Sequence, residues 1–222
     1  MNLNKHQEFF NPTQIKEEIH IIGCGAIGST VAEMLTRLGF TSLYLYDFDK
    51  VSDHNITNQM FRMKDIGKLK VDALEEILTD INPDIKINKH PEGWNEYTRL
   101  SGIIFLAVDN IELRKQIVES MMYNNAVKYV TDCRMALTDA QTYAADWSDA
   151  SAITSVLSTM QFTSEEAKAA TPVSACGTSL SVTPTVRMIV SLCVANLINF
   201  LKGKPYNKVL IADSFAMNIV GF

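Results

Sequence analysis

The chain has little of what would place it among nucleic-acid-binding, secreted or membrane proteins. Its 222 residues carry a net charge of −5, and no run of lysine and arginine provides the basic surface that nucleic acids need. The N-terminus is polar and charged, unlike a signal peptide. The longest apolar run, residues 188–201, is interrupted by asparagine and is too short to span a bilayer. We therefore expect a cytoplasmic protein with no nucleic-acid partner and no membrane partner.

Metal-binding and disulfide patterns are also missing. The four cysteines form no CxxC pair, and the four histidines are scattered singly. These spacings exclude a zinc site of recognisable pattern and favour free thiols in a reducing compartment. A hydrophobic content of 47% and a charged content of 20% describe an ordinary globular chain that can bury one core. We expect one domain over residues 1–222, with an N-terminal extension over residues 1–17.

What is present is an alternation of strand-like and helix-like segments. Short β-rich runs occupy residues 18–25, 42–49, 84–90, 102–110 and 128–133. Segments with helical spacing of apolar residues lie between them, at 26–40, 70–82 and 111–125. This order predicts an α/β fold with a Rossmann-like, doubly wound and mainly parallel sheet. A late strand is expected at residues 140–147, and it could run antiparallel.

The composition changes between residues 148 and 177, where serine, threonine and alanine predominate. One short helix-like piece, residues 165–170, is expected there, so we interpret the segment as a mobile crossover. An apolar helix over residues 186–201 follows and ends near Gly203, a candidate C-terminal cap. Residues 208–213 and 214–222 supply antiparallel closing strands. The predicted fold therefore ends in a crossover loop, a helix and these strands.

A glycine-rich turn lies between the first expected strand and the first expected helix. Gly23, Gly25 and Gly28 have the GxGxxG spacing, which permits a tight turn and places a helix N-terminus against a phosphate. Asp47 follows about 20 residues later, where a carboxylate can accept hydrogen bonds from ribose hydroxyls. This pattern alone would indicate NAD. A glycine turn that packs without a ligand is the less favoured alternative.

The residues after Asp47 do not follow a dehydrogenase pattern. Polar side chains and an "INP" run follow in a characteristic order along the chain. The side chains before the run are Asp49, Asn55, Gln59 and Lys70, and Asp109 comes after it. Over about residues 20–114, the sequence resembles the adenylating family of ThiF, MoeB, HesA and the ubiquitin-type activating enzymes. These elements in this order are far more specific than the glycine turn alone.

The resemblance implies an adenylation that uses ATP and Mg²⁺, in which a carboxylate attacks the α-phosphorus and pyrophosphate leaves. By resemblance, Asp47 holds the ribose, Lys70 contacts phosphate and Asp109 helps to hold the metal ion. The residues so assigned to the nucleotide are Gly23, Gly25, Ile27, Gly28, Asp47, Asp49, Asn55, Gln59 and Lys70. From residue chemistry alone, Lys70 would be a solvated lysine at a helix start, and a strand-end cap would be equally plausible for Asp109.

One position departs from the family pattern. The arginine that the family has in "NLNRQ" is Asn58 here, which removes a phosphate-binding cation, and no arginine precedes Arg37. Some family dimers supply an arginine from the partner's N-terminal region. Arg62, one helical turn beyond Asn58, is our candidate to occupy the same space and act in catalysis. The alternative is that Arg62 is a surface residue and that ATP handling is impaired.

A second resemblance concerns the sequence "CGTSLSVTPT", which begins at Cys176. It is similar to the segment around the catalytic cysteine of the short single-chain activating enzymes, the form that serves the UFM-type modifier. A cysteine near a helix N-terminus gains thiolate character and can take an acyl group from an adenylate. A small packing residue is the alternative for Cys176. Cys133 is the reserve nucleophile because an arginine follows it, whereas Cys193 lies mid-helix among apolar residues.

Four functions are consistent with these patterns. The first is adenylation of the C-terminal carboxylate of a ubiquitin-like or ThiS/MoaD-like carrier protein, followed by thioester capture on Cys176. The second is adenylation of a peptide or another small acceptor, with tRNA disfavoured by the acidic net charge. The third is a catalytically degenerate scaffold subunit, and the fourth is a plain NAD-binding protein. A homodimer is expected because the chain is small and the resembling family is commonly dimeric.

Overall fold

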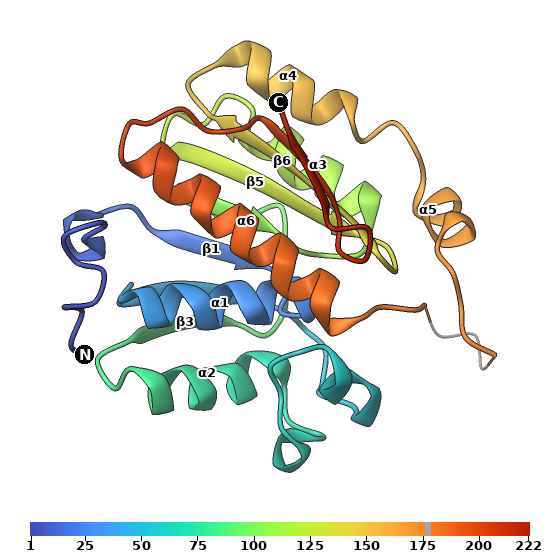
Figure 1. Ribbon diagram of the computed structural model, residues 1–222, viewed down its shortest axis with the longest axis horizontal. Helices are drawn as coiled ribbons and strands as arrows, with labels where there is room; N and C mark the ends of the chain where they lie inside the picture. Colours follow the sequence, from blue (N-terminus) through green and yellow to red (C-terminus); the bar gives the residue numbers. More distant parts are fainter. Residues whose placement is uncertain (176–178) are drawn as a thin grey trace.

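One mixed sheet forms the centre of the molecule (Figure 1). The structure is a computed structural model that describes residues 1–175 and 179–222, and in that part the sheet has eight strands in the order β3-β2-β1-β4-β5-β6-β7-β8. The strands are β1 (Ile19–Ile22), β2 (Ser42–Tyr46), β3 (Lys86–His90), β4 (Gly102–Leu106), β5 (Val127–Met135), β6 (Asp139–Asp146), β7 (Val209–Asp213) and β8 (Asn218–Gly221). The first five are parallel, and β6, β7 and β8 are antiparallel. The predicted Rossmann-like sheet with antiparallel closing strands is confirmed.

The strand order reverses between β1 and β4. β1 pairs in parallel with β2 on one side and with β4 on the other. Both faces of these strands are buried, as Ile21 and Ile104 illustrate, which explains why they read as continuous apolar runs. In an open α/β sheet, ligands bind outside the carboxyl ends of the strands at such a reversal.

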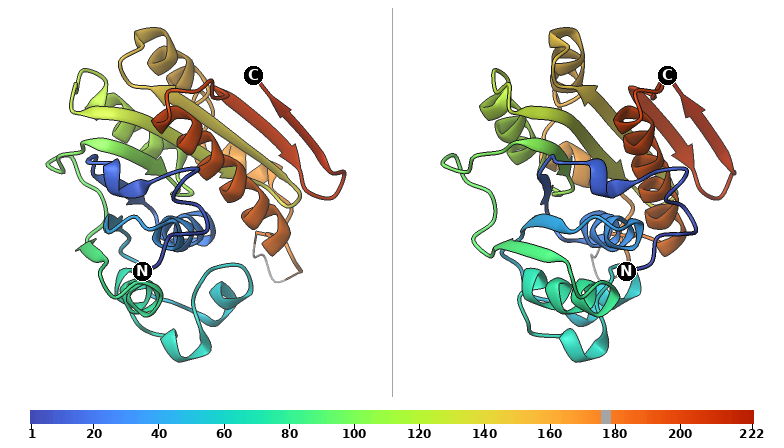
Figure 2. Two further views of the ribbon diagram at one scale, coloured as in Figure 1. Left: turned by 60° about the vertical axis from the view of Figure 1, so that its left-hand side comes forward. Right: turned by 90° about the vertical axis from the view of Figure 1, so that its left-hand side faces the viewer.

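Helices cover both faces of the sheet (Figure 2). One face carries α1 (Ala26–Leu38), α2 (Lys70–Ile81) and α6 (Thr183–Leu201), which close a hydrophobic core with side chains such as Leu45 and Phe105. The opposite face carries α3 (Ile111–Met121) and α4 (Ala150–Ser158) over a second core that includes Leu106 and Val130. This two-faced covering is the doubly wound arrangement that the alternation of strands and helices predicts.

The apolar helix α6 is a core element of this domain. By length and composition it is the one helix of the described residues that could cross a membrane. In the structure it packs against α1, β5, β6 and β7 and buries Val186, Ile189 and Leu197. The polar Asn196 is satisfied within the core, because its side chain exchanges two hydrogen bonds of 2.8 Å with the backbone of Asn207.

The segment from residue 148 onward contains more regular structure than predicted. Asp149 accepts hydrogen bonds from backbone N–H groups of the first turn of α4, and Ile153 and Val156 are buried in the second core. The helix α5 (Ser164–Ala170) lies at the predicted place and begins with a capping box formed by Thr163 and Glu166. The expectation of one short helix is therefore corrected: α4 is a second one. Its few apolar residues are separated by serines and threonines, so the sequence shows no clear helical spacing of apolar residues.

The connection from β3 to β4, residues 91–101, is fully described and contains no helix. A parallel crossover normally carries one. Here Trp94 packs against the second core instead, and Gly93, with φ +77°, turns the chain over the ring of Phe48. An irregular segment therefore lies directly beside the carboxyl end of β2.

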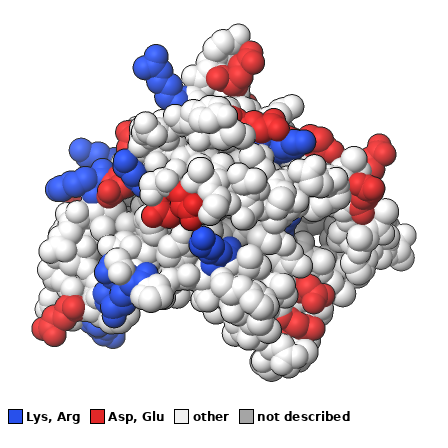
Figure 3. All heavy atoms as spheres, turned by 90° about the horizontal axis from the view of Figure 1, so that it is seen from above, with Lys and Arg blue, Asp and Glu red and all other residues white. Residues whose placement is uncertain are grey.

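Charges on the surface are mixed. Figure 3 shows acidic and basic side chains interspersed among uncharged ones on one face. Several of the surface lysines are paired, such as Lys68 with Glu76 at 2.6 Å and Lys89 with Glu75 at 2.6 Å. Because exposed ion pairs contribute little to stability, the two cores carry most of it.

The buried His20 on β1 should make the stability of the protein depend on pH. The ring is 1% exposed, its Nδ1 lies 2.9 Å from the hydroxyl of Tyr46, and burial lowers the pKa of His20 to about 4. In the unfolded state the His20 ring binds a proton from about pH 6.5 downward, whereas in the folded state it does so only near pH 4. The free energy of unfolding should therefore be unaffected by His20 above about pH 6.5 and fall by about 3 kcal/mol as the pH drops to 4. Urea unfolding across that range should show a shallower pH slope for His20→Gln. An identical slope would contradict this assignment.

Candidate functional site

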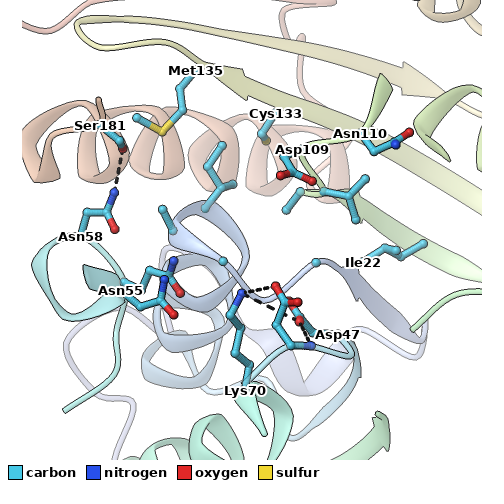
Figure 4. A pocket seen from close by; sticks show the side chains of 18 of the residues that line it. Ile22, Asp47, Asn55, Asn58, Lys70, Asp109, Asn110, Cys133, Met135 and Ser181 are labelled. Carbon is cyan, nitrogen blue, oxygen red and sulfur yellow. Dashed lines mark hydrogen bonds and ion pairs between the residues drawn. The ribbon is translucent and has the colours of Figure 1, made fainter. Parts of the chain in front are cut away.

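A cavity of about 910 Å³ lies at the carboxyl ends of β1, β2, β4 and β5 (Figure 4). Its walls come from the glycine turn, the residues after β2, the loop of residues 54–59, the start of α3 and residues 179–181. Segments that are distant in sequence therefore meet where the strand order reverses. Most of the candidate residues line this cavity: Gly23, Gly25, Ile27, Asp47, Asp49, Asn55, Gln59, Lys70 and Asp109.

The glycine turn presents backbone to the cavity. Gly23 has φ +94°, and a Cβ there would lie 2.7 Å from the carbonyl of Ala107. Gly25 forms the N-cap of α1, and no side chain in the described ranges caps it. The first N–H groups of α1 therefore remain available to an anion in the cavity.

Two glycines of this turn should respond differently to alanine. A Cβ at Gly28 would lie 1.8 Å from the carbonyl oxygen of Gly23, so Gly28→Ala must displace backbone and should cost at least about 2 kcal/mol of stability. At Gly25, φ is −75° and no described atom lies within 4 Å of the Cβ position, so Gly25→Ala should lose only the preference of an N-cap for glycine over alanine, about 1 kcal/mol or less. Thermal and urea unfolding check both. Equal stabilities of the two variants would contradict the packing role of Gly28.

Asp47 and Lys70 form a charged cluster with Asp49 on one side of the cavity. The two carboxylate oxygens of Asp47 accept hydrogen bonds from the backbone N–H of Cys24 at 2.7 Å and of Asp49 at 2.8 Å. Lys70 Nζ lies 2.7 Å from Asp49 Oδ2 and 4.0 Å from Asp47 Oδ1. Burial raises the pKa of Asp47, and the charge of Lys70 opposes that rise. Lys70 has three donor hydrogens, so it can hold both carboxylates and still donate to a ligand.

The loop of residues 54–59 adds amide side chains. Asn55 is buried, and its Oδ1 accepts a hydrogen bond of 3.0 Å from the backbone N–H of Ser52, which leaves Nδ2 as a donor. Asn58, the residue at the family's arginine position, donates Nδ2 to Ser181 Oγ at 2.8 Å, as Figure 4 shows. Asn58 thus joins this loop to the segment that leads into α6.

Three buried polar atoms of the cavity residues lack a hydrogen-bond partner in the described part of the chain: Gln59 Oε1, Trp94 Nε1 and Arg114 Nε. The described residues contain two further atoms of this kind, in His20 and Thr142. A buried polar atom without a partner costs free energy unless a ligand or water satisfies it. Three such atoms among the residues of one cavity fit a site for a polar ligand.

Asp109 follows β4 and directs its carboxylate into the cavity (Figure 4). Within residues 1–175 and 179–222, no group of three or more His, Cys, Asp or Glu side chains could hold a metal ion. Mg²⁺ is commonly held by one or two carboxylates together with the phosphates of a substrate. A single carboxylate at this place is the kind of protein ligand that such a shared Mg²⁺ site would use.

Arg114 fixes the turn that carries Asp109. Its guanidinium is buried and donates to the carbonyl of Val108 and to the carboxylate of Asp132, which also pairs with Arg134 at 2.5 Å. Burial lowers the pKa of Arg114 to about 9, so the group stays charged at neutral pH. In the sequence, Arg114 comes five residues after Asp109, and this spacing places its guanidinium under the β4–α3 turn.

Two candidates lie outside the described lining of the cavity. The Arg62 guanidinium is held by carboxylates: Nε donates to the buried Asp65 at 2.8 Å, and Nη1 lies 3.3 Å from Asp80. The structure therefore does not bring Arg62 to the place where Asn58 leaves no cation. Gly28 packs behind Gly23 and does not line the phosphate region.

Cys176 lies outside the described residues, so its role stays a prediction. Of the other cysteines, Cys133 lines the cavity, and its Sγ donates to Cys193 Sγ at 3.3 Å. This hydrogen bond and burial raise the pKa of Cys133 well above its ordinary value. A thiol that stays protonated is a poor nucleophile, which argues against the reserve assignment. Cys193 is 1% exposed inside α6, as expected for a core residue.

The fold is similar to those of two solved proteins. With E. coli MccB, solved with ATP, the TM-score is 0.71 at 19% sequence identity, over 93% of this chain and 63% of that one. With PaaA the TM-score is 0.71 at 15% identity, over 99% of this chain and 68% of that one. At these identities the likeness shows the fold.

Similarity in sequence extends over shorter stretches. Ubiquitin-like modifier-activating enzyme 5 of Dictyostelium discoideum is 46% identical over 70 residues, which are 32% of this chain and 18% of that protein. The enzyme of the same name from Drosophila willistoni is 41% identical over 91 residues, 40% of this chain and 21% of that protein. The matched part thus spans only 18–21% of the length of these relatives. Residues 14–221, nearly the whole sequence, match the sequence model of the ThiF family. The chain therefore belongs to the ThiF family.

Proposed function

We propose that this protein uses ATP to adenylate the C-terminal carboxylate of a ubiquitin-like or sulfur-carrier protein. The observation behind this is the buried Asp47–Lys70 pair beside an uncapped helix N-terminus, at the reversal point of the sheet. Together these groups offer an acceptor for ribose hydroxyls, a cation and backbone N–H groups for phosphates. Support also comes from the sequence likeness to modifier-activating enzymes and the fold likeness to MccB, solved with ATP.

In the proposed reaction, ATP places its ribose on Asp47 and its phosphates between the glycine turn and Lys70. A carboxylate oxygen of the acceptor attacks the α-phosphorus, the bond to the bridging oxygen breaks, and pyrophosphate leaves with that electron pair. Lys70, the Asn55 amide and the N–H groups of α1 are placed to stabilise the charge on the phosphates. Mg²⁺ bound at Asp109 would neutralise part of the same charge.

We extend the proposal to a second step on Cys176. Ser174 and Ser179, which flank it in the sequence, both line the cavity. The Cys176 thiolate would attack the acyl carbon of the adenylate, and AMP would leave as the thioester forms. The hydrogen bond of 2.7 Å from Thr183 Oγ1 to the carbonyl of Thr57 anchors the chain that follows.

Pyrophosphate release tests the first step. With ATP and Mg²⁺, a ubiquitin-like protein with a free C-terminal glycine carboxylate should support release of pyrophosphate. The same protein with an amidated C-terminus should not, because it has no carboxylate to attack the α-phosphorus. Screening several ubiquitin-like proteins, each in its free and its amidated form, identifies the acceptor. Release of pyrophosphate with an amidated form would contradict the proposed chemistry.

A peptide acceptor is the second candidate, since it needs the same nucleotide site. The fold likeness to MccB, which is solved with MccA as well as with ATP, fits this alternative. Release of pyrophosphate with a short peptide alone, and with none of the ubiquitin-like proteins, would assign the peptide reaction. ATP binding without release in either assay would favour the scaffold subunit that Asn58 suggests.

A further inference from the structure

The cavity has an apolar side and a polar side. The apolar side is formed by residues that belong to the second core or pack against it: Ile22, Tyr46, Trp94, Val108 and Leu113. The polar side contains Asn55, Asn58, Gln59 and Lys70. Asp47 directly follows Tyr46 and lies near Lys70, so it stands between the two sides, as Figure 4 shows for Ile22, Asp47 and Asn55. A nucleotide with its ribose on Asp47 would direct its phosphates to one side and its base to the other.

On the apolar side, Trp94 has a polar atom that no described residue satisfies. It lies in the helix-free β3–β4 connection, one residue after Gly93 turns the chain over Phe48. Its indole Nε1 is buried and has no hydrogen-bond partner among the described residues. The second tryptophan of the chain, Trp147, donates its Nε1–H to the carbonyl of Met121 at 2.8 Å. An indole N–H normally finds a partner when buried, and Trp94 is the one that lacks it.

We propose that Trp94 is the nucleobase-binding residue of this site, and that its indole N–H donates a hydrogen bond to a ring nitrogen of adenine. This rests on the proposed use of ATP. The ring nitrogens N1, N3 and N7 of adenine are acceptors only, which suits a side chain that can only donate. The flat base would pack against Val108 and Leu113, while the N–H fixes its orientation. Base binding then comes from the irregular segment that replaces a crossover helix.

The N–H can be removed without removing the ring. Trp94→Phe keeps an aromatic side chain and should weaken ATP binding about tenfold, the effect of one buried hydrogen bond. Trp147→Phe is the matched control: its N–H is paired outside the cavity, so the affinity for ATP should not change. Titrations with ATP and with 1-deaza-, 3-deaza- and 7-deaza-ATP complete the design, since each analogue lacks one acceptor nitrogen.

For the wild type, one of the three analogues should bind about tenfold more weakly than ATP. Trp94→Phe should bind that analogue and ATP equally, because the same hydrogen bond is missing in both. If Trp94→Phe binds ATP like the wild type, or loses the same factor for ATP and all three analogues, Trp94 does not donate to the base. If the wild type binds no ATP at all, the proposed function fails as well, which separates the two failures.

A second measurement does not depend on the folding of Trp94→Phe. In Trp147→Phe, Trp94 is the only tryptophan, so its fluorescence reports on the cavity directly. ATP should change this emission, and the analogue that lacks the acceptor nitrogen should change it at about tenfold higher concentration. Equal responses to ATP and to every analogue would overturn the assignment.

Discussion

Lys70→Met should reduce the affinity for ATP at least about 100-fold. Lys70 is 7% exposed and is the cation that lines the polar side of the cavity beside Asp47 and Asp49. Methionine keeps most of the apolar stem but removes the charge, so the phosphates lose their cation. The rise in the pKa of Asp47 that burial causes is then no longer opposed by the charge of Lys70. Isothermal titration with ATP and Mg²⁺ measures the change.

Lys68→Met is the matched control for this variant. Lys68 lies two residues away, is paired with Glu76 at 2.6 Å and does not belong to the described lining of the cavity. Its replacement should leave the affinity for ATP within about twofold of wild type, because an exposed ion pair contributes little. If the two variants bind ATP equally well, Lys70 is not the phosphate-binding cation.

The second large effect is expected at Cys176. With ATP, Mg²⁺ and the acceptor protein, the wild type should form a covalent adduct that a thiol reagent releases. Cys176→Ala should form none, because no thiolate is present to attack the acyl carbon, while pyrophosphate is still released at the first step and AMP stays in the acyl-adenylate. Denaturing gel electrophoresis with and without thiol, together with pyrophosphate release, separates the two steps.

The other cysteines serve as controls for the adduct. Cys193→Ala should still form it, since Cys193 is buried in α6 away from the cavity. Cys133→Ala should also form it, because burial and its hydrogen bond to Cys193 keep the Cys133 thiol protonated. An adduct that survives in Cys176→Ala and disappears in Cys133→Ala would move the nucleophile to β5.

The parallel half of the fold could be read from the sequence because its signals are local. Strands buried on both faces read as apolar runs, and α1 ends at Gly39, where φ is +97°, as a helix-ending glycine should. Since the carboxyl ends of parallel strands meet at one edge, residues such as Asp47 and Asp109 had to come together. The order of motifs along the chain was therefore sufficient to assemble most of the cavity.

The rest depends on contacts between distant parts of the chain. Trp94 was missed because nothing in the sequence shows that the β3–β4 connection lacks a helix and turns toward β2. Arg62 was placed near Asn58 by spacing alone, but the buried carboxylate of Asp65 holds its guanidinium. The helix α4 was missed because its few apolar residues are stabilised by packing on β6, which periodicity does not reveal.

The measurement that tests the central claim most directly is a calorimetric titration of the wild-type protein with ATP and Mg²⁺ and, separately, with NAD, repeated on Asp109→Ala. We expect ATP to bind with a stoichiometry of about one per chain, NAD not to bind, and the variant to bind ATP more weakly when Mg²⁺ is present. Binding of NAD, or of neither nucleotide, would contradict an adenylating site in this cavity.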